Sequence, residues 1–319
     1  MTTLRQRKST ESGPFSGRFN PKLGKKADFT PKSSEGKPLI SHIWWSRIVM
    51  MASVLIVAYW SNSKTTVTIM AKRSENLTNK RYQNILCHPS YKNEISNTLQ
   101  NPKCVPYKCG RVVMDDIIPS DTAYNLLQIA KKGFALSESS GGASILDLHS
   151  GTISKGEHFI NLYANHPDVF SPEEYALYAY VKNAVKEEVA KHFQIDSESL
   201  YLSYPTFFSR ITAKPALTLH DEYWHSHIDK DTYPSFHYTS LLYLTDFEDD
   251  FRGGNFVFID DKLNRTIEPK FGRVSIFTSG MENKHHVEPV TEGVRFALTM
   301  GFTCDKSKAI ADPGTNSEK

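Results

Sequence analysis

The sequence predicts an α+β protein: a double-stranded β-helix, or jelly-roll, with N-terminal helices packed on one sheet and a single transmembrane helix before it. Three observations lead to this fold class. After Asp196 the pattern changes from helical spacing to short β-rich runs separated by turn residues. The 319 residues are 39% hydrophobic and 12% aromatic, which is enough to fill a core. A long uncharged run precedes the regular part of the chain.

Residues 1–42 form a basic, polar start that we expect to be a disordered cytosolic tail. They are rich in Lys, Ser, Gly and Pro and poor in large apolar residues. Up to Arg47 the chain carries ten Lys and Arg against three acidic residues, although the net charge of the whole chain is only +3. A basic start can be a solvated tail, a nucleic-acid-binding segment or the cytosolic flank of a membrane helix, and the segment that follows favours the last.

Residues 43–64 are predicted to form a signal anchor, a single helix that crosses the membrane. Their uncharged part, residues 48–63, would span roughly 24 Å as a helix, short of the roughly 30 Å hydrocarbon core. Length alone therefore also fits a cleaved signal peptide or the buried helix of a soluble protein. The preceding segment is long for a signal peptide, and no small-residue cleavage site follows. Aromatic pairs typical of membrane interfaces lie at both ends: Trp44 and Trp45, and Tyr59 and Trp60.

This orientation predicts a single-pass type II membrane protein whose body lies in the endoplasmic reticulum or Golgi lumen, or outside the cell. Two N-glycosylation sequons agree with that location: Asn76-Leu77-Thr78, with its acceptor at Asn76, and Asn264-Arg265-Thr266, with its acceptor at Asn264. Beyond the basic start the chain is slightly acidic, so nucleic acid is not an expected partner.

Three of the four cysteines, Cys87, Cys104 and Cys109, lie in residues 65–115, which we expect to form a lumenal stem. Cys304 closes the last predicted strand. An even number of cysteines in an oxidising compartment indicates disulfides. A zinc site is the alternative, although the C-x-x-C spacing typical of such sites is absent. We expect one bridge from Cys304 to the cluster and one within the cluster, with the pairing left open.

The main folded domain is expected at residues 116–305, with a flexible tail at residues 306–319. Ser120 and Asp121 can cap a helix that runs to about Lys132 and ends at Gly133. A second helix begins at Ser171-Pro172-Glu173-Glu174 and ends near Phe193. The β-rich runs that follow are residues 200–211, 223–229, 237–245, 255–259, 273–278, 284–290 and 294–303.

The run 223–229 holds three candidate metal ligands, His225, His227 and Asp229. Side chains two residues apart point to the same face of a strand, so all three would point the same way. His285 offers a further ligand from a distant run. Two histidines and one carboxylate on one face of a metal, with the other positions open, are typical of non-haem Fe(II) oxygenase sites.

The spacing resembles the H-x-D…H…R/K pattern of the 2-oxoglutarate- and Fe(II)-dependent oxygenases. His227-Ile228-Asp229 supplies H-x-D, His285 lies 56 positions after Asp229, and Arg295 lies ten positions further. The context resembles the prolyl 4-hydroxylase-like branch, over roughly residues 200–305. The segments that carry this second resemblance are Tyr243-Leu244-Thr245-Asp246 and Gly253-Gly254-Asn255-Phe256-Val257-Phe258. Thr245 stands where the branch often has Asn, a departure outside the site.

The resemblance implies that His227, Asp229 and His285 bind Fe(II), and that Arg295 and Tyr243 bind 2-oxoglutarate as cosubstrate. His285 is preferred to its neighbour His286 because the family histidine precedes x-Val-x-Pro. The strand of Arg295 fits such a pocket, because small residues alternate with large ones: Ala297, Thr299 and Gly301 share the face of Arg295, whereas Phe296, Leu298, Met300 and Phe302 share the other. His225 remains open between contact with the site and simple solvation.

The reaction that the resemblance implies is hydroxylation of a protein side chain, of prolyl or lysyl type, in the secretory lumen. The cosubstrates would be O₂ and 2-oxoglutarate, which is converted to succinate and CO₂, with ascorbate as a further cofactor. A catalytically silent lumenal binding module on the same barrel is the alternative. A cupin-type enzyme with another metal is a third, which Arg295 and its small-residue strand disfavour.

Overall fold

The computed structural model describes residues 40–61, 67–137 and 141–314, and the chain divides into two compact units, Met1–Ser63 and Lys64–Lys319. The described part of the first unit is one helix, α1 (Ile40–Ser61). Within the described residues, no helix combines the length and the apolar character that crossing a membrane requires. Most of the predicted tail, residues 1–39, lies outside the described residues, as do residues 62–66 of the predicted anchor and stem.

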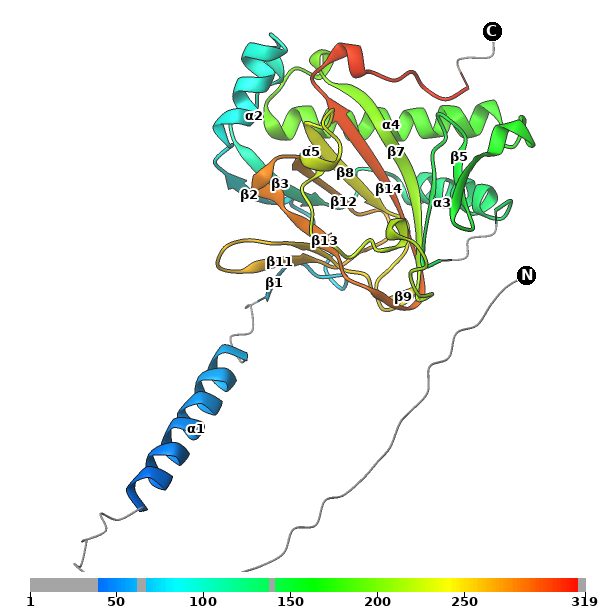
Figure 1. The fold of residues 1–319 in the computed structure, drawn as a ribbon. Coiled ribbons are helices and arrows are strands. Elements are labelled where there is room, and N and C mark those ends of the chain that lie inside the picture. Colours follow the sequence, from blue (N-terminus) through cyan, green and yellow to red (C-terminus); the bar gives the residue numbers. More distant parts are fainter. Residues whose placement is uncertain (1–39, 62–66, 138–140, 315–319) are drawn as a thin grey trace, which may run out of the picture. The chain divides into compact units, whose positions relative to one another are not determined.

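The second unit is built on two β-sheets (Figure 1). The smaller sheet has four strands in the order β1 (Val67–Ala71), β11 (Asn264–Ile267), β10 (Phe256–Phe258) and β13 (His285–Val287). The larger has ten strands: β2 (Arg81–Ile85), β3 (Cys109–Met114), β12 (Val274–Thr278), β8 (Tyr238–Tyr243), β14 (Val290–Thr303), β7 (Tyr201–Thr212), β4 (Ala143–Leu146), β5 (Thr152–Lys155) and β6 (His158–Asn161) in this order, with β9 (Phe251–Gly253) paired to β14.

The interior of the barrel is a hydrophobic cluster drawn from both sheets. Phe256 and Phe258 of the smaller sheet pack with Tyr243, Phe277 and Ala297 of the larger one. Strand alternation places these side chains on the inner faces of the two sheets. The predicted double-stranded β-helix is thereby confirmed.

Two long helices cover the outer face of the larger sheet: α3 (Ser120–Phe134) and α4 (Pro172–Phe193). Their apolar side chains form an extensive cluster together with Phe296, Leu298, Met300 and Phe302 of β14. The predicted alternation along this strand is confirmed, since Ala297 belongs to the inner cluster.

The helix ends follow from local chemistry. The predicted start of α4 is a capping box, in which Ser171 accepts from the amide of Glu174 while the Glu174 carboxylate accepts from the amide of Ser171. The predicted end of α3 at Gly133 is wrong, because the helix continues to Phe134. A Cβ at Gly133 would lie 2.4 Å from a methyl group of Leu146, so this glycine serves close packing rather than termination.

Six of the seven predicted β-rich runs are strands, whereas residues 223–229 are not.

The segment predicted as a stem, residues 65–115, differs more from its prediction. Its strands β1, β2 and β3 belong to the two sheets, so no domain boundary lies near residue 116. A short helix, α2 (Pro89–Asn93), and one π-helical turn, η1 (Glu94–Thr98), connect β2 to β3. Residues 306–314, predicted as a flexible tail, pack on the body, where Ile310 donates its amide to Leu202.

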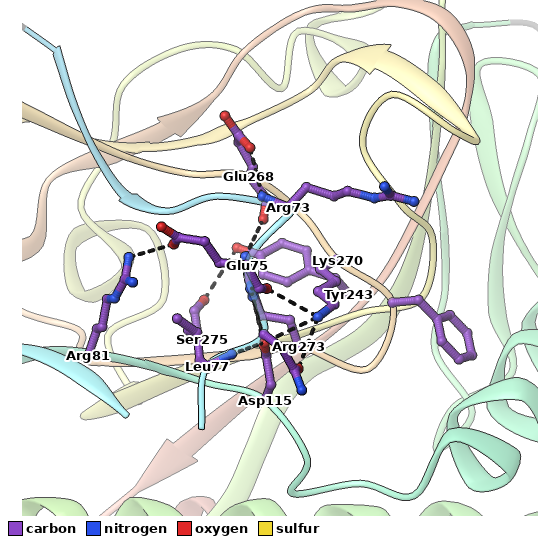
Figure 2. Close-up of polar contacts among 12 residues, drawn as sticks. Arg73, Glu75, Leu77, Arg81, Asp115, Tyr243, Glu268, Lys270, Arg273 and Ser275 are labelled. Carbon is purple, nitrogen blue, oxygen red and sulfur yellow. Dashed lines mark hydrogen bonds and ion pairs between the residues drawn. The ribbon is translucent and has the colours of Figure 1, made fainter. Parts of the chain in front are cut away.

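Residues 67–115 are attached to the rest of the second unit by a disulfide and by a buried arginine side chain. Disulfides join Cys87 to Cys109 and Cys104 to Cys304, which confirms one bridge to Cys304 and one within the cluster. The guanidinium of Arg273, fully buried, donates to both carboxylate oxygens of Asp115 at 2.8 and 3.0 Å (Figure 2). It also donates at 3.0 Å to the carbonyl groups of three residues: Lys72, Glu75 and Glu268.

Candidate metal centre and cosubstrate pocket

Two histidines that are far apart in the sequence meet at the end of β13. His227 and His285 form an isolated antiparallel bridge, with amide-to-carbonyl distances of 2.9 and 3.0 Å. Their ring centroids are 4.4 Å apart. The predicted strand over residues 223–229 is wrong, because this bridge is its only β pairing and Asp229 opens a short helix, α5 (Asp229–Thr232). The first three residues of that run form turns and a bend.

The Asp229 carboxylate completes a compact group of donors. Its Oδ1 lies 3.4 Å from Nε2 of His227 and 3.5 Å from Nε2 of His285. Oδ2 accepts from the hydroxyl of Thr239 at 2.6 Å, and that hydroxyl is 2.8 Å from the hydroxyl of Ser279. One donor atom from each of the three predicted ligands lies within 4.8 Å of the other two, which is the spacing of a site that could hold a metal ion.

Both imidazole rings are oriented by backbone carbonyl groups. Nδ1 of His227 is 3.0 Å from the carbonyl of His225, and Nδ1 of His285 is 2.8 Å from the carbonyl of Asn283. A carbonyl only accepts, so each Nδ1 carries a hydrogen, and each Nε2 is the nitrogen that can bind a metal once it is deprotonated. Metal-binding histidines are commonly held in this way.

The charges of the three groups suit a divalent cation. Burial lowers the pKa of His285 to about 4, so this imidazole is neutral at physiological pH. Burial raises the pKa of Asp229, but the interactions with His285, His227 and Thr239 outweigh it and hold the pKa below its usual range. Burial lowers the pKa of His227, and the hydrogen bond and charge of Asp229 more than reverse this, so it is raised overall. One ionised carboxylate and an already neutral His285 are the donor states that a metal needs.

Aromatic side chains pack around the imidazole ring of His285. The Phe256 ring stacks on the imidazole at 4.8 Å and an interplanar angle of 26°. Phe277 and Phe258 approach the same ring at 5.0 and 6.2 Å. These rings keep water away from one side of the site, so a metal bound there would be exposed only on the side that the donors leave open.

Arg295 and Tyr243 lie together within the same barrel. The guanidinium of Arg295, 1% exposed, is 5.4 Å from the centroid of the Tyr243 ring, and its Nε donates to the Gly254 carbonyl at 2.9 Å. Its Nη2 has no hydrogen-bond partner among the described residues. Gly254 has φ +66, and a Cβ there would lie 3.1 Å from Cδ of Arg295, so only glycine allows this approach.

The unpartnered Nη2 of Arg295 suits an anionic partner. A buried cationic donor without a partner is costly, and a carboxylate would satisfy it with a charge-assisted hydrogen bond. One short segment contacts both Arg295 and the metal centre: the Gly254 carbonyl accepts from Arg295, and Phe256, two residues on, stacks on His285. The residues therefore fit Fe(II) together with a dicarboxylate such as 2-oxoglutarate.

The remaining candidates are not among the donors. The side chain of His225, 67% exposed, pairs with Glu222 at 2.6 Å, although its carbonyl orients His227. His286 does not belong to the donor group, whereas the preferred residue His285 does. Thr239, which binds the Asp229 carboxylate, is not predicted by the sequence. It lies on a predicted strand, but nothing in the sequence pairs that strand with residue 229.

Comparisons with known proteins agree with this geometry. The family model described as "2OG-Fe(II) oxygenase superfamily" matches residues 208–302. The 2-oxoglutarate and iron-dependent oxygenase domain-containing protein 3 of Xenopus tropicalis is 43% identical over 292 residues, which cover 89% of this chain and 90% of that protein. The chain belongs to the 2OG-Fe(II) oxygenase superfamily.

Two further relatives place the chain within this superfamily. The human protein of the same name is 51% identical over 66% of this chain and 67% of its own length. Human prolyl 3-hydroxylase 2 is 46% identical over 71 residues, 21% of this chain and 10% of that protein. The chain is therefore a 2OG-Fe(II) oxygenase, an oxidoreductase that uses Fe(II) and 2-oxoglutarate, with prolyl hydroxylases among its relatives.

Proposed function

We propose that this oxygenase hydroxylates a protein side chain, of prolyl or lysyl type, and that His227, Asp229 and His285 hold its iron while Arg295 and Tyr243 hold 2-oxoglutarate. The observation that carries the proposal is the unpartnered, buried Nη2 of Arg295 within a barrel whose three metal donors are all present. A barrel that had lost catalysis would be free to lose any of these groups.

Each residue has a definable task. Arg295 binds the distal carboxylate of 2-oxoglutarate, and the Tyr243 ring packs against its guanidinium. Thr239 holds one carboxylate oxygen of Asp229, which directs the other toward the two Nε2 atoms. When bound, Fe(II) and 2-oxoglutarate supply the oxidation, in which 2-oxoglutarate and O₂ yield succinate, CO₂ and one oxygen atom for a substrate C–H bond.

Turnover by the purified chain tests the activity and separates it from the alternative of a silent binding module. With Fe(II), 2-oxoglutarate and ascorbate, we expect succinate formation that His227→Ala and Asp229→Ala abolish. Undiminished turnover in either variant would contradict the assigned ligands. A chain that binds 2-oxoglutarate but forms no succinate with any protein fraction would be a binding module.

The substrate class rests on the relatives, because prolyl 3-hydroxylase 2 is named for a protein-modifying reaction. Proteins from cells that contain the active chain or Asp229→Ala can be compared by mass spectrometry. We expect prolyl or lysyl residues that carry one additional oxygen only with the active chain. If the additional oxygen lies only on other residue types or on small molecules, the proposed class is wrong.

The body is proposed to lie in the secretory lumen, attached by a single type II membrane span. Its two disulfides suit an oxidising compartment, and Asn76 is exposed in its sequon. The Asn264 side chain is less accessible, since its Oδ1 is buried within β11. We expect a glycosidase-sensitive mass shift that Asn76→Gln removes, and protection of the body from protease in sealed microsomes. Cleavage of the body in sealed microsomes would refute this topology.

A further inference from the structure

A cluster of charged and polar side chains lies beside the metal centre and is not part of it. Lys230 follows Asp229 directly, and its Nζ is 2.6 Å from Oε1 of Glu94. The same oxygen is 3.3 Å from Nε2 of His237. The Lys230 side chain is only 16% exposed and that of His237 only 1%. None of these three residues belongs to the donor group.

Lys230 closes the turn that begins with Asp229. Its Nζ donates to the Pro234 carbonyl at 2.6 Å, and its amide donates to the Ser279 carbonyl at 2.9 Å. Ser279 also contacts the Thr239 hydroxyl that binds the Asp229 carboxylate. Hydrogen bonds therefore connect both the backbone after Asp229 and the Asp229 carboxylate to Ser279, which directly follows β12.

Glu94 anchors this turn from a distant part of the chain. It lies 136 positions before Lys230, in η1, between the disulfide-bonded Cys87 and Cys104. Near it, the buried hydroxyl of Tyr91 donates to the His237 carbonyl. Because the segment is cross-linked and packed on both sides, Glu94 is a fixed point rather than a mobile surface group.

The carboxylate of Glu94 stays charged. Partial burial raises its pKa, but hydrogen bonds from His237 and Lys230 outweigh this and lower the pKa to about 2. Removing the charge would leave the Lys230 ammonium mostly buried without its counter-ion. The turn would then relax so that the ammonium reaches water, and Asp229 would move with it.

We propose that Glu94 is a positioning residue for the iron site, which acts through Lys230 to hold the Asp229 carboxylate at the two histidines. It touches neither the metal donors nor the 2-oxoglutarate pocket, so its effect is on metal affinity and not on the chemical step. Partners of this kind commonly change metal affinity by roughly 10- to 100-fold.

The test compares Glu94→Gln with Glu75→Gln in the full chain. Glu75 is a matched control because it is also 35% exposed and also forms a 2.6 Å ion pair, with Arg81, away from the metal centre (Figure 2). Co(II), titrated without 2-oxoglutarate and followed by its visible absorption, reports binding without turnover. We expect the dissociation constant to rise about 10-fold or more in Glu94→Gln and to stay unchanged in Glu75→Gln.

A double-mutant cycle separates positioning from a general loss of stability. Lys230→Gln should weaken Co(II) binding as Glu94→Gln does, and the double variant should be no weaker than the single variants, because both remove one contact. If Glu94→Gln does not fold, the Co(II) affinity of Lys230→Gln is compared with that of Glu75→Gln instead. Co(II) affinity equal to that of Glu75→Gln, or additive losses in the double variant, would overturn the proposal.

Discussion

Replacing Arg295 with Met removes the proposed partner of 2-oxoglutarate while leaving no new buried polar group at that position. In the free protein this guanidinium donates from Nε to the Gly254 carbonyl and packs on Tyr243. The substitution therefore removes little from the folded state beyond these contacts. Its effect should fall on the binding of the cosubstrate, whose distal carboxylate would lose a buried, charge-assisted hydrogen bond.

The magnitude follows from the burial of both groups. A hydrogen bond to a charged group contributes about 1.5–3 kcal/mol, and the upper end applies where both partners are charged and desolvated. A loss of about 3 kcal/mol corresponds to somewhat more than 100-fold in affinity. At a concentration of 100 times its dissociation constant, 2-oxoglutarate stabilises the parent protein by about 2.7 kcal/mol. The Arg295→Met variant would then be stabilised by only about 0.3 kcal/mol.

Urea unfolding with and without 2-oxoglutarate measures this difference, in anaerobic buffer with Mn(II) to prevent turnover. Arg210→Met is a suitable control, because Arg210 lies on the neighbouring strand β7 and also has a buried nitrogen, Nε, with no partner among the described residues. We expect the control to keep the full stabilisation by 2-oxoglutarate. If Arg295→Met keeps it as well, the unpartnered Nη2 is not the binding group and the assignment of the pocket is wrong.

Three further predictions concern the metal site and the disulfides. Thr239→Val removes the hydroxyl that directs the Asp229 carboxylate and should weaken Co(II) binding by roughly 10-fold at unchanged fold, as measured by absorption titration and circular dichroism. Because the pKa of His227 is raised and its proton must leave before a metal binds, metal affinity should begin to fall while the pH is still above about 6.5, in titrations across pH. A metal affinity that stays constant down to pH 5 would contradict this prediction. Replacing Cys104 and Cys304 with Ser opens a bridge of sequence separation 200 and should cost about 2 kcal/mol more in urea unfolding than opening the bridge of separation 22.

The proposed iron donors and Arg295 can be picked out from the sequence because their spacing is characteristic. His227 and Asp229 are two positions apart, and His285 precedes a recognisable run. Alternation along residues 294–303 predicts that Arg295 and Ala297 share one face, and both are buried, with Ala297 in the interior cluster of the barrel. Patterns of period two depend on neighbours in the chain, so a single sequence is enough to detect them.

The expected strand at residues 223–229 is wrong for a physical reason. Alternation does bring side chains two residues apart to one face, but here Asp229 reaches the site from the first turn of a helix and is directed by Thr239. A short polar run fits either conformation, and only its pairing with other segments decides. The bridge to His285, which settles the conformation at His227, is a contact between distant residues.

The expectation of a separate stem fails because its strands are short and of mixed polarity. The strand β2 has only exposed and half-buried residues, and β1 is buried only near its end. Their place in the sheets depends on contacts between distant residues that the sequence does not display, such as the pairing of β1 with β11 and the hydrogen bonds from Arg273 to the carbonyls of Lys72 and Glu75. For the same reason, the sequence gives no sign of the contact between Glu94 and Lys230, which joins segments 136 positions apart.

The bridge between Cys104 and Cys304 has a consequence for synthesis. Its two cysteines are 200 positions apart, and β1, which comes before them, pairs with the late strand β11. At 5–20 residues per second, Cys104 emerges from the ribosome roughly 10–40 s before its partner. During that interval the nearer Cys109 and Cys87 are its available partners. The native partner of Cys104 is therefore absent until almost the whole chain has been made, so this bridge can fasten the segment before β3 to the end of β14 only after synthesis of the sheets is complete.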